Sequence, residues 1–258
     1  MGAIIEIVPI CCAWRLFWEI ILDNLFIVMP AYNEEDNIEA VIKQWYPILK
    51  GKGEKSRLVI ADSGCTDRTH EIIEDLKKNG YPNIRTFSKG DKQHGPKVLN
   101  LYKYAIVNGA DYIFQTDSDG QTNPDEFGKF WDNRNEYDVV LGYRPIRGDG
   151  KDRKFVENVV CLIVRLFFGV RVQDANAPFR LMKTGVVKKY IGRFPKDYNI
   201  PNIIFTTYFV YYNEKVLFLP ITFKPRQGGK NSINVKSIVK IGIKALGDFA
   251  AFRRGMKK

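Results

Sequence analysis

The sequence predicts an α/β protein with one mostly parallel sheet flanked by helices, and three observations lead to this fold class. Short apolar segments alternate with segments whose apolar residues recur at helical spacing. Residues 25–29 are apolar throughout, as expected of a strand buried on both faces of a parallel sheet. Polar clusters follow several predicted strands, at the positions where open α/β sheets bind ligands. With 258 residues, of which 45% are hydrophobic, the chain is long enough for one large domain of this kind.

The first half of the chain alternates strictly between the two kinds of element. Asn33 is expected to cap a helix that starts near residue 34, and Asn79-Gly80 is expected to stop the following one. Such alternation favours parallel strands joined by right-handed crossovers. The predicted order is strand 25–29, helix 34–49, strand 57–61, helix 67–78, strand 84–87, helix 96–107 and strand 112–116.

The second half has a looser pattern. Phe179, Leu181 and Met182 are interpreted as core residues, in a segment without an assigned element. The predicted elements are strand 139–142, a basic loop 143–154, helix 155–168, strand 216–223, a basic glycine loop 225–232 and helix 235–252.

Two acidic residues, Asp117 and Asp119, follow the strand predicted at 112–116. Asn123 can cap the helix that comes next. Mg²⁺ or Mn²⁺ is typically held by one or two carboxylates together with substrate phosphates, so this pair indicates a metal-bound diphosphate. Acidic pairs are also common at turns, so the pair alone does not distinguish a metal site from an ordinary turn. Clusters at 30–35 and 62–66 also end strands, and we expect all three clusters to meet in one crevice.

Composition limits the partners and the compartment. The net charge of +11 indicates an anionic partner such as a nucleotide, a lipid phosphate, a membrane surface or nucleic acid. The four cysteines have no metal-ligand spacing, which favours a reducing, cytoplasmic location without disulfides. Two histidines exclude a histidine-rich metal site, and no stretch of about 20 apolar residues indicates a spanning helix. The apolar residues 1–22 are compatible with docking on the domain, lying on a membrane, or an upstream start.

Six motifs occur in order along the chain: Pro30-Ala31-Tyr32-Asn33-Glu34-Glu35, Ala61-Asp62-Ser63-Gly64-Cys65-Thr66-Asp67, Asp117-Ser118-Asp119, Gly142-Tyr143-Arg144, Asp174 with Pro178-Phe179-Arg180-Leu181-Met182, and Pro225-Arg226-Gln227-Gly228-Gly229-Lys230. Together they resemble the motifs of family 2 glycosyltransferases, most closely the dolichol-phosphate mannosyltransferase branch and its bacterial polyprenyl-phosphate relatives. The resemblance covers roughly residues 25–232 and implies a single-domain GT-A fold. We therefore expect a catalytic domain 24–232, with a nucleotide half 24–121 and an acceptor half 122–232, between an apolar segment 1–23 and a basic amphipathic helix 233–258.

The resemblance implies a donor site for a nucleotide-diphosphate sugar of the UDP or GDP type. Asp62 would accept hydrogen bonds from the base or ribose, although such a residue also caps turns, and Tyr32 also suits a core. The metal, Mg²⁺ or Mn²⁺, would stabilise the departing diphosphate. The residues implied for the nucleotide are Pro30, Ala31, Tyr32, Glu34, Asp62, Asp117 and Gln121, and those implied for the metal are Asp117, Asp119 and Gln121.

Further residues are implied for catalysis and for the acceptor. Asp119 belongs to the catalytic set, and Arg226 and Lys230 would add positive charge at the diphosphate. Asp174 would face the acceptor and act as base toward a hydroxyl, whereas a phosphate acceptor, already ionised, needs no base. The residues expected to grip a lipid phosphate are Arg144, Arg147 and Arg153, unless they simply form a basic surface loop.

The predicted function is therefore an inverting, metal-dependent transfer of a sugar, with polyprenyl phosphate as the expected acceptor. One alternative is transfer to a saccharide hydroxyl in surface-polysaccharide assembly. A non-enzymatic alternative is a basic module that binds membrane or nucleic acid, although no nucleic-acid partner is expected. The lysines of the last helix are compatible with a peripheral position on the inner face of a membrane.

Overall fold

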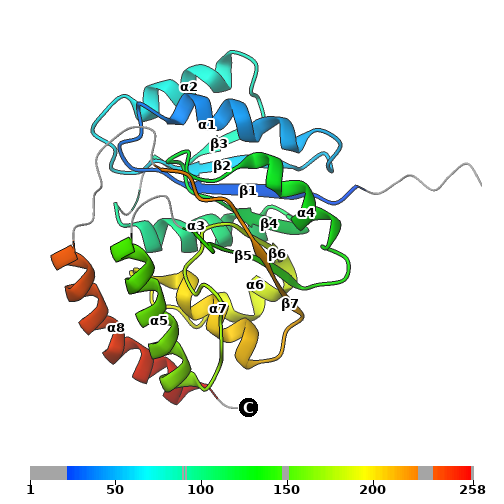
Figure 1. Ribbon diagram of the computed structural model, residues 1–258. Helices are drawn as coiled ribbons and strands as arrows, with labels where there is room; N and C mark the ends of the chain where they lie inside the picture. The colour runs from blue at the N-terminus through cyan, green and yellow to red at the C-terminus, as the bar shows by residue number, and fades with distance from the viewer. Residues whose placement is uncertain (1–21, 89, 91, 147–150, 226–234, 257–258) are drawn as a thin grey trace, which may run out of the picture.

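The computed structural model describes residues 22–88, 90, 92–146, 151–225 and 235–256, with side chains left undescribed at 151–152 and 235–244. In this part of the chain, seven strands form one sheet in the order β3-β2-β1-β4-β6-β5-β7 (Figure 1). The strands are β1 (Leu25–Pro30), β2 (Arg57–Ala61), β3 (Ile84–Thr86), β4 (Tyr112–Gln115), β5 (Val139–Tyr143), β6 (Arg180–Lys183) and β7 (Val216–Pro220).

The sheet is mostly parallel, as predicted. β1 pairs in parallel with β2 and β4, β2 with β3, and β5 with β7. β6 runs antiparallel to both of its neighbours, β4 and β5, so it is the one strand of this sheet that points in the opposite direction. Six strands consequently end at the same edge. This edge faces left in Figure 1, on the side where α5 and α8 begin.

Helices cover both faces of the sheet. The α-helices are α1 (Ile38–Trp45), α2 (Thr69–Lys78), α3 (His94–Val107), α4 (Phe127–Asp132), α5 (Lys151–Phe168), α6 (Thr184–Ile191), α7 (Pro201–Tyr211) and α8 (Val235–Gly255), and two 3₁₀ segments are η2 (Tyr46–Leu49) and η3 (Pro124–Glu126). α1, α2 and α4 share one core cluster with the sheet, whereas α3, α6 and α7 share the other. The molecule is therefore a three-layer arrangement.

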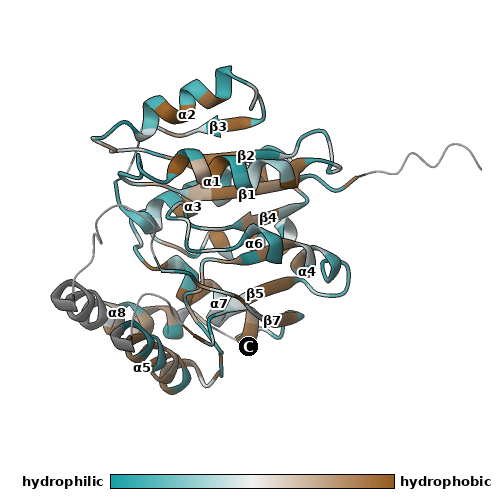
Figure 2. Ribbon diagram, turned by 45° about the horizontal axis from the view of Figure 1, so that its top comes forward, coloured by the Kyte–Doolittle hydropathy of each residue, from teal (hydrophilic) through white to brown (hydrophobic). Residues whose placement is uncertain are grey.

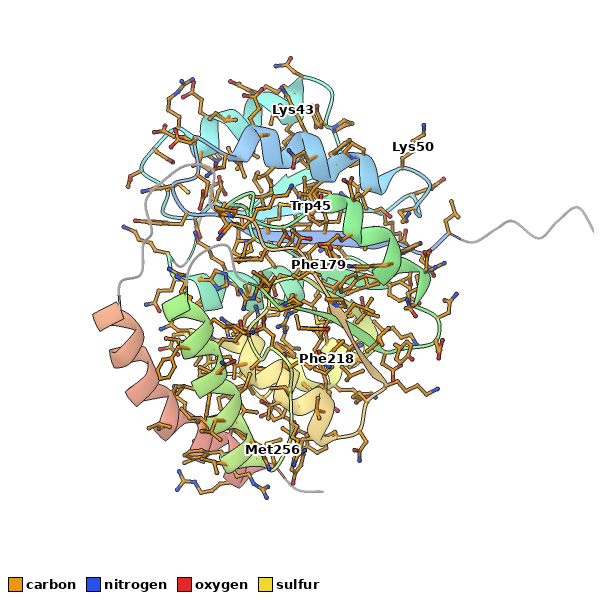
Figure 3. All side chains as sticks on the ribbon, viewed as in Figure 1. Lys43, Trp45, Lys50, Phe179, Phe218 and Met256 are labelled. Carbon is orange, nitrogen blue, oxygen red and sulfur yellow. The ribbon has the colours of Figure 1, made fainter. Side chains whose placement is uncertain are left out.

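Strand β1 explains why both clusters form. All six of its residues are buried. Phe26 and Val28 belong to the cluster under α3, and Ile27 and Met29 to the cluster under α1, because side chains alternate across a strand. Figure 2 shows hydrophobic residues along the central strands. In Figure 3, Trp45 and Phe179 lie in the middle of the molecule, with ring centroids 5.8 Å apart. The core assignment of Phe179 is confirmed.

The start of the first helix differs from its prediction. Asn33 does not cap it: the helix begins at Ile38, and Asn33 adopts a left-handed φ of 54°. Its side chain instead accepts a hydrogen bond from the backbone N–H of Thr66, at 2.9 Å. This contact with the end of β2 keeps residues 31–36 as a loop. Asn123 does act as a cap, for η3, where its side chain accepts from Asp125 N.

Three elements, β6, α6 and α7, were not predicted at all. In α7, residues 201–209 are all buried, so the helix lacks the polar face that reveals an amphipathic helix. β6 is only four residues long and begins with Arg180. In the part of the chain that the structure describes, no helix is both long and apolar enough to cross a membrane.

Candidate active site

Three polar clusters meet at the carboxyl edge of the sheet because β2, β1 and β4 are neighbours. Ala31 N donates to Ala61 O at 2.9 Å, which joins the ends of β1 and β2. Ser118 Oγ donates to Pro30 O at 2.9 Å, which joins the end of β1 to the loop after β4. The strand ends are thus connected beyond the sheet itself, and the residues between them form one edge.

The first two motifs are held together by a set of cross-bonds. Besides the bond between Asn33 and Thr66, Glu35 N donates to Asp67 Oδ2 at 3.1 Å. Asp67 Oδ1 accepts from Thr69 Oγ1 at 2.6 Å and from Thr69 N at 3.1 Å. Burial alone would raise the pKa of Asp67, but these hydrogen bonds outweigh it and lower the pKa. The paired loops form a rigid rim beside the strand ends.

Asp62, the first residue after β2, is buried and half-paired. Its Oδ2 lies 2.5 Å from Nδ1 of His70 on α2. Its Oδ1 is also buried and has no hydrogen-bond partner within the described ranges. A buried carboxylate oxygen without a partner is unusual, and it marks Asp62 as a candidate contact for a ligand N–H or O–H. His70 was not singled out from the sequence.

Tyr32 and Glu34 have opposite environments. Tyr32 is 41% exposed, so packing in the core does not explain it. Its ring lies 5.3 Å from Nζ of Lys97, a buried lysine that donates to Ala31 O at 2.5 Å. Glu34 is buried, and its Oε2 accepts from Asn37 Nδ2 at 2.9 Å. Lys97 was missed, although a lysine on the apolar stripe of α3 was a detectable signal.

The loop after β4 is closed on itself and presents two carboxylates. Thr116 Oγ1 and Thr122 Oγ1 lie 2.7 Å apart, and Gln121 N donates to Asp119 Oδ1 at 3.1 Å. Gln121 Nε2 donates to Lys224 O at 2.8 Å. Among the described residues, Asp117 Oδ1 is buried and makes no hydrogen bond, and Nε2 of His94 lies 3.5 Å from it. These hydrogen bonds therefore hold the loop that carries Asp117 and Asp119 in one conformation.

These acids fit a hard divalent cation only if a substrate completes its coordination. The unsatisfied oxygen of Asp117 favours a positive partner. No group of three or more His, Cys, Asp and Glu side chains suited to a metal occurs among the residues described. A pair of carboxylates supplemented by phosphate oxygens is the usual arrangement for Mg²⁺.

Asp174 and Arg144 form a buried ion pair beside this edge. Arg144 Nε donates to Asp174 Oδ2 at 2.7 Å, and Arg144 Nη2 donates to Oδ1 at 3.1 Å. Glu157 Oε2 lies 3.6 Å from Arg144 Nη2, and Lys154 Nζ donates to Glu157 Oε1 at 2.6 Å. Arg144 was expected as a phosphate ligand, and its main contact here is with Asp174. Arg153 is half-buried in α5, and Arg147, Arg226 and Lys230 lie outside the described residues.

A second buried arginine, Arg180, belongs to a motif named from the sequence, but no site role was assigned to it. It donates to the carbonyls of Ala177 and Asn202. Burial lowers its pKa, while the nearby carboxylates of Asp174 and Asp117 act in the opposite direction. Its charge therefore contributes to the potential around both acids. An arginine at the start of an apolar strand was the available signal.

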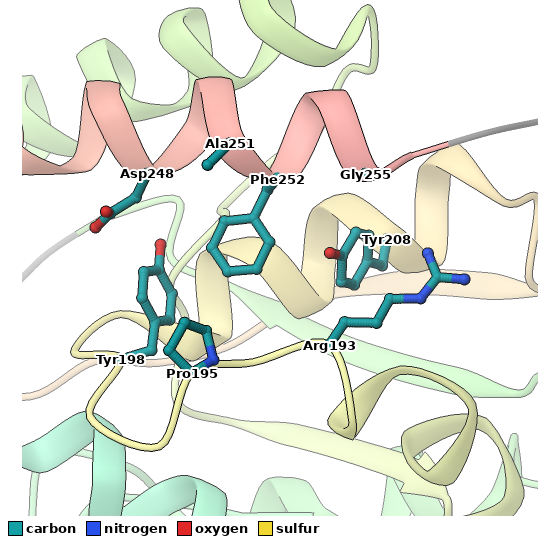
Figure 4. Close-up of a pocket in the computed structure, with 8 residues that line it drawn as sticks. All are labelled: Arg193, Pro195, Tyr198, Tyr208, Asp248, Ala251, Phe252 and Gly255. Atoms are coloured by element: carbon teal, nitrogen blue, oxygen red, sulfur yellow. The ribbon is translucent and has the colours of Figure 1, made fainter.

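One cavity adjoins this framework, and another lies away from it. One, of about 370 Å³, borders the strand-end edge and is lined by Ser63 and Lys97 among others. The other, of about 490 Å³, lies between α8 and the chain around α7, as Figure 4 shows. Its lining residues are Arg193, Pro195, Tyr198, Tyr208, Asp248, Ala251, Phe252 and Gly255. Since none of these is a predicted site residue, the strand-end edge is the candidate active site.

Comparison with known proteins identifies the family of the chain. The model of glycosyl transferase family 2 matches residues 26–191, and the chain belongs to this family. It is 21% identical over 217 residues to an undecaprenyl-phosphate 4-deoxy-4-formamido-L-arabinose transferase of Edwardsiella ictaluri, covering 83% of this chain and 64% of the relative. It is 30% identical over 190 residues to an uncharacterized protein of Methanocaldococcus jannaschii, covering 69% and 72% respectively. The chain spans only 53–64% of the length of several such arabinose transferases.

Solved structures agree on the fold. Glucosyl-3-phosphoglycerate synthase of Mycobacterium tuberculosis in complex with UDP superposes with a TM-score of 0.64 at 16% identity, covering 92% of this chain and 82% of that one. The same enzyme with Mn²⁺, UDP-glucose and glycerol 3-phosphate gives a TM-score of 0.62. The predicted GT-A fold is confirmed.

Proposed function

We propose that this protein transfers a sugar, with inversion, from a nucleoside-diphosphate sugar to the phosphate group of a polyprenyl phosphate. The observation that carries the proposal is the Asp117–Asp119 loop, closed on itself and bonded to the end of β1, with one buried oxygen unsatisfied. The family match supports glycosyl transfer. The undecaprenyl-phosphate transferases among the relatives support a lipid phosphate as acceptor.

The nucleoside would lie along the paired loops at the ends of β1 and β2. Pro30 and Ala31 form the floor there, and the exposed ring of Tyr32 offers a surface for base or ribose. Asp62 Oδ1 would accept a hydrogen bond from the base. Glu34, turned toward Asn37, would act by holding the loop.

The diphosphate would lie over Asp117, Asp119 and Gln121. A Mg²⁺ or Mn²⁺ ion bound by the two carboxylates would supply Lewis-acid stabilisation of the departing nucleoside diphosphate. Gln121 fixes the loop through its bonds to Asp119 and Lys224. Arg226 and Lys230, which follow Lys224 in the sequence, would add positive charge near the leaving group.

The environment of Asp174 favours a phosphate acceptor over a hydroxyl. Both carboxylate oxygens accept from Arg144, and Oδ1 also accepts from Asn176 N at 3.1 Å. Taking a proton from a hydroxyl would weaken that buried pair, which is costly. A phosphate monoester, with a second pKa of about 6, attacks without a base. Arg144 would then position Asp174, while Arg147 and Arg153 would meet the incoming phosphate.

An exposed apolar stripe on α5 supports access to a lipid. Phe155, Val159, Leu162 and Leu166 recur at helical spacing and are between 38% and 74% exposed. α5 begins at the edge that carries the site (Figure 1). A membrane surface covering this stripe would bring a phosphate headgroup to the acceptor side of the crevice.

A transfer assay with radiolabelled UDP-sugars and GDP-sugars tests the proposal. Purified protein with Mn²⁺ receives undecaprenyl phosphate, a saccharide acceptor, or no acceptor. We expect labelled product with the lipid phosphate and none in the same reaction with Asp119→Ala. Product with the saccharide alone would refute the lipid-phosphate acceptor, and a fully active Asp119→Ala variant would refute the metal role.

A further inference from the structure

We propose that His70 makes the nucleotide site selective for uracil or thymine over guanine, by occupying one oxygen of Asp62. The inference deepens the proposed function and rests on it. Two observations carry it: the 2.5 Å contact between His70 Nδ1 and Asp62 Oδ2, and the buried, unsatisfied Asp62 Oδ1.

The contact fixes which atom of Asp62 remains for a ligand. A carboxylate only accepts hydrogen bonds, so His70 must carry its proton on Nδ1. Asp62 is 2% exposed, whereas the His70 side chain is 48% exposed on α2. His70 therefore bonds Oδ2 of the buried acid from the exposed side of α2, and Oδ1 is the oxygen of Asp62 without a hydrogen bond in the described part of the chain.

The base edges differ in how many donors they present to a carboxylate. Guanine presents N1–H and N2–H side by side, a pair that matches both oxygens of one carboxylate. Uracil and thymine present a single donor, N3–H, flanked by two carbonyl oxygens. Adenine and cytosine place an acceptor nitrogen beside their amino group, which a carboxylate repels. One free oxygen thus matches the single N–H of uracil or thymine.

Guanine would be disfavoured because its second donor would have to share Oδ2 with Nδ1 of His70. A shared hydrogen bond is weaker than an unshared one, and sites discriminate against ligands whose polar groups are imperfectly paired. Removing His70 removes the competing donor at Asp62 Oδ2, so that both carboxylate oxygens can accept from guanine without sharing. The proposal therefore predicts a change in selectivity as well as a change in affinity.

The experiment measures dissociation constants of UDP, TDP, GDP and ADP in the presence of Mn²⁺ by isothermal titration calorimetry. The proteins are the wild type, His70→Ala, His70→Gln, which keeps a side-chain donor, and Lys78→Ala, an exposed control on the same helix. We expect the wild type and Lys78→Ala to bind UDP or TDP at least about tenfold tighter than GDP. The ratio should fall about tenfold in His70→Ala and persist in His70→Gln.

Each outcome is decisive. Equal or tighter binding of GDP by the wild type overturns the proposal, as does an unchanged ratio in a folded His70→Ala variant. Tight GDP binding leaves sugar transfer intact and removes only the base assignment. Absence of binding by every nucleotide would overturn this inference and the proposed function together.

Discussion

The guanidinium of Arg144 and the carboxylate of Asp174 meet in a two-bond ion pair, with Nε 2.7 Å from Oδ2 and Nη2 3.1 Å from Oδ1. Both residues are buried. Arg144 directly follows β5, and Asp174 lies in the segment between α5 and β6. The pair therefore ties the end of β5 to the chain that enters β6, on the acceptor side of the candidate site.

Replacing Arg144 by Met should destabilise the fold strongly, because Asp174 would stay buried without its partner. Breaking a buried pair by removing one member typically costs about 3–5 kcal/mol. Urea unfolding at neutral pH measures this free energy. The control is Arg165→Met, an exposed position on α5, which should change stability by less than about 0.5 kcal/mol. Similar stability of the two variants would show that the pair contributes little.

Asp119→Asn should remove transfer activity without unfolding the protein. The substitution keeps the size of the side chain and an oxygen for Gln121 N, but it removes a charge from the proposed metal seat. We expect at least about a 100-fold loss of turnover, the scale of losing one electrostatic contact at a reacting centre. Product formation across a Mn²⁺ titration and the melting temperature are measured together. Asp125→Asn, in the neighbouring η3, is the matched control. Wild-type turnover in Asp119→Asn would contradict the assignment.

The sequence was sufficient for the first half of the sheet. β1, β2, β3 and β4 lie within one residue of their predicted bounds. The signal is clearest for β1, whose six residues are all buried, because strands buried on both faces are continuous apolar runs. The same criterion fails for α7, which is buried on all sides and carries no helical alternation. For Asn33, the tertiary hydrogen bond with Thr66 overrides the local preference of asparagine for a helix N-cap.

The candidate site was predicted in part, and its missing residues share a physical reason. Asp62 directly follows β2, and Asp117 and Asp119 lie in the loop after β4, so the sheet topology alone predicts their common edge. Lys97 contacts Ala31, 66 residues away in the sequence, and Arg180 on β6 contacts Asn202 on α7. No local pattern encodes such partners. The sequence signal for such a buried charged residue is a lysine or arginine on an otherwise apolar face.

Asp67→Asn should destabilise the protein in a pH-dependent way. Hydrogen bonds from Thr69 and Glu35 outweigh the effect of burial and lower the pKa of Asp67 below its unfolded value near 3.8. A depressed carboxyl pKa contributes stability that is present above the unfolded pKa and is lost as pH falls through the folded one. We expect a cost of about 1 kcal/mol at pH 7, and a difference from the wild type that shrinks below about pH 4. Urea unfolding across this range measures it.

The control for this prediction is Asp75→Asn, an exposed residue on α2, the helix that follows Asp67, which should match the wild type. A pH-independent difference between Asp67→Asn and the wild type would mean that the hydrogen bonds do not depend on the charge of Asp67.

Removing apolar side chains from α5 should weaken binding to membranes. The double variant Leu162→Gln with Leu166→Gln changes two exposed residues of the stripe and leaves the ion pair of Arg144 untouched. Full burial of a leucine contributes about 1.5–3 kcal/mol, so even partial insertion of both predicts at least about a tenfold loss of binding. Co-sedimentation with vesicles of phosphatidylcholine and phosphatidylglycerol measures it. Binding by the wild type should also weaken with salt, given the net charge of +11.

The control is Val107→Gln, at a position that is 84% exposed at the end of α3, and this variant should bind as the wild type does. Wild-type protein that stays in the supernatant, or a double variant that sediments equally, would rule out α5 as a membrane contact.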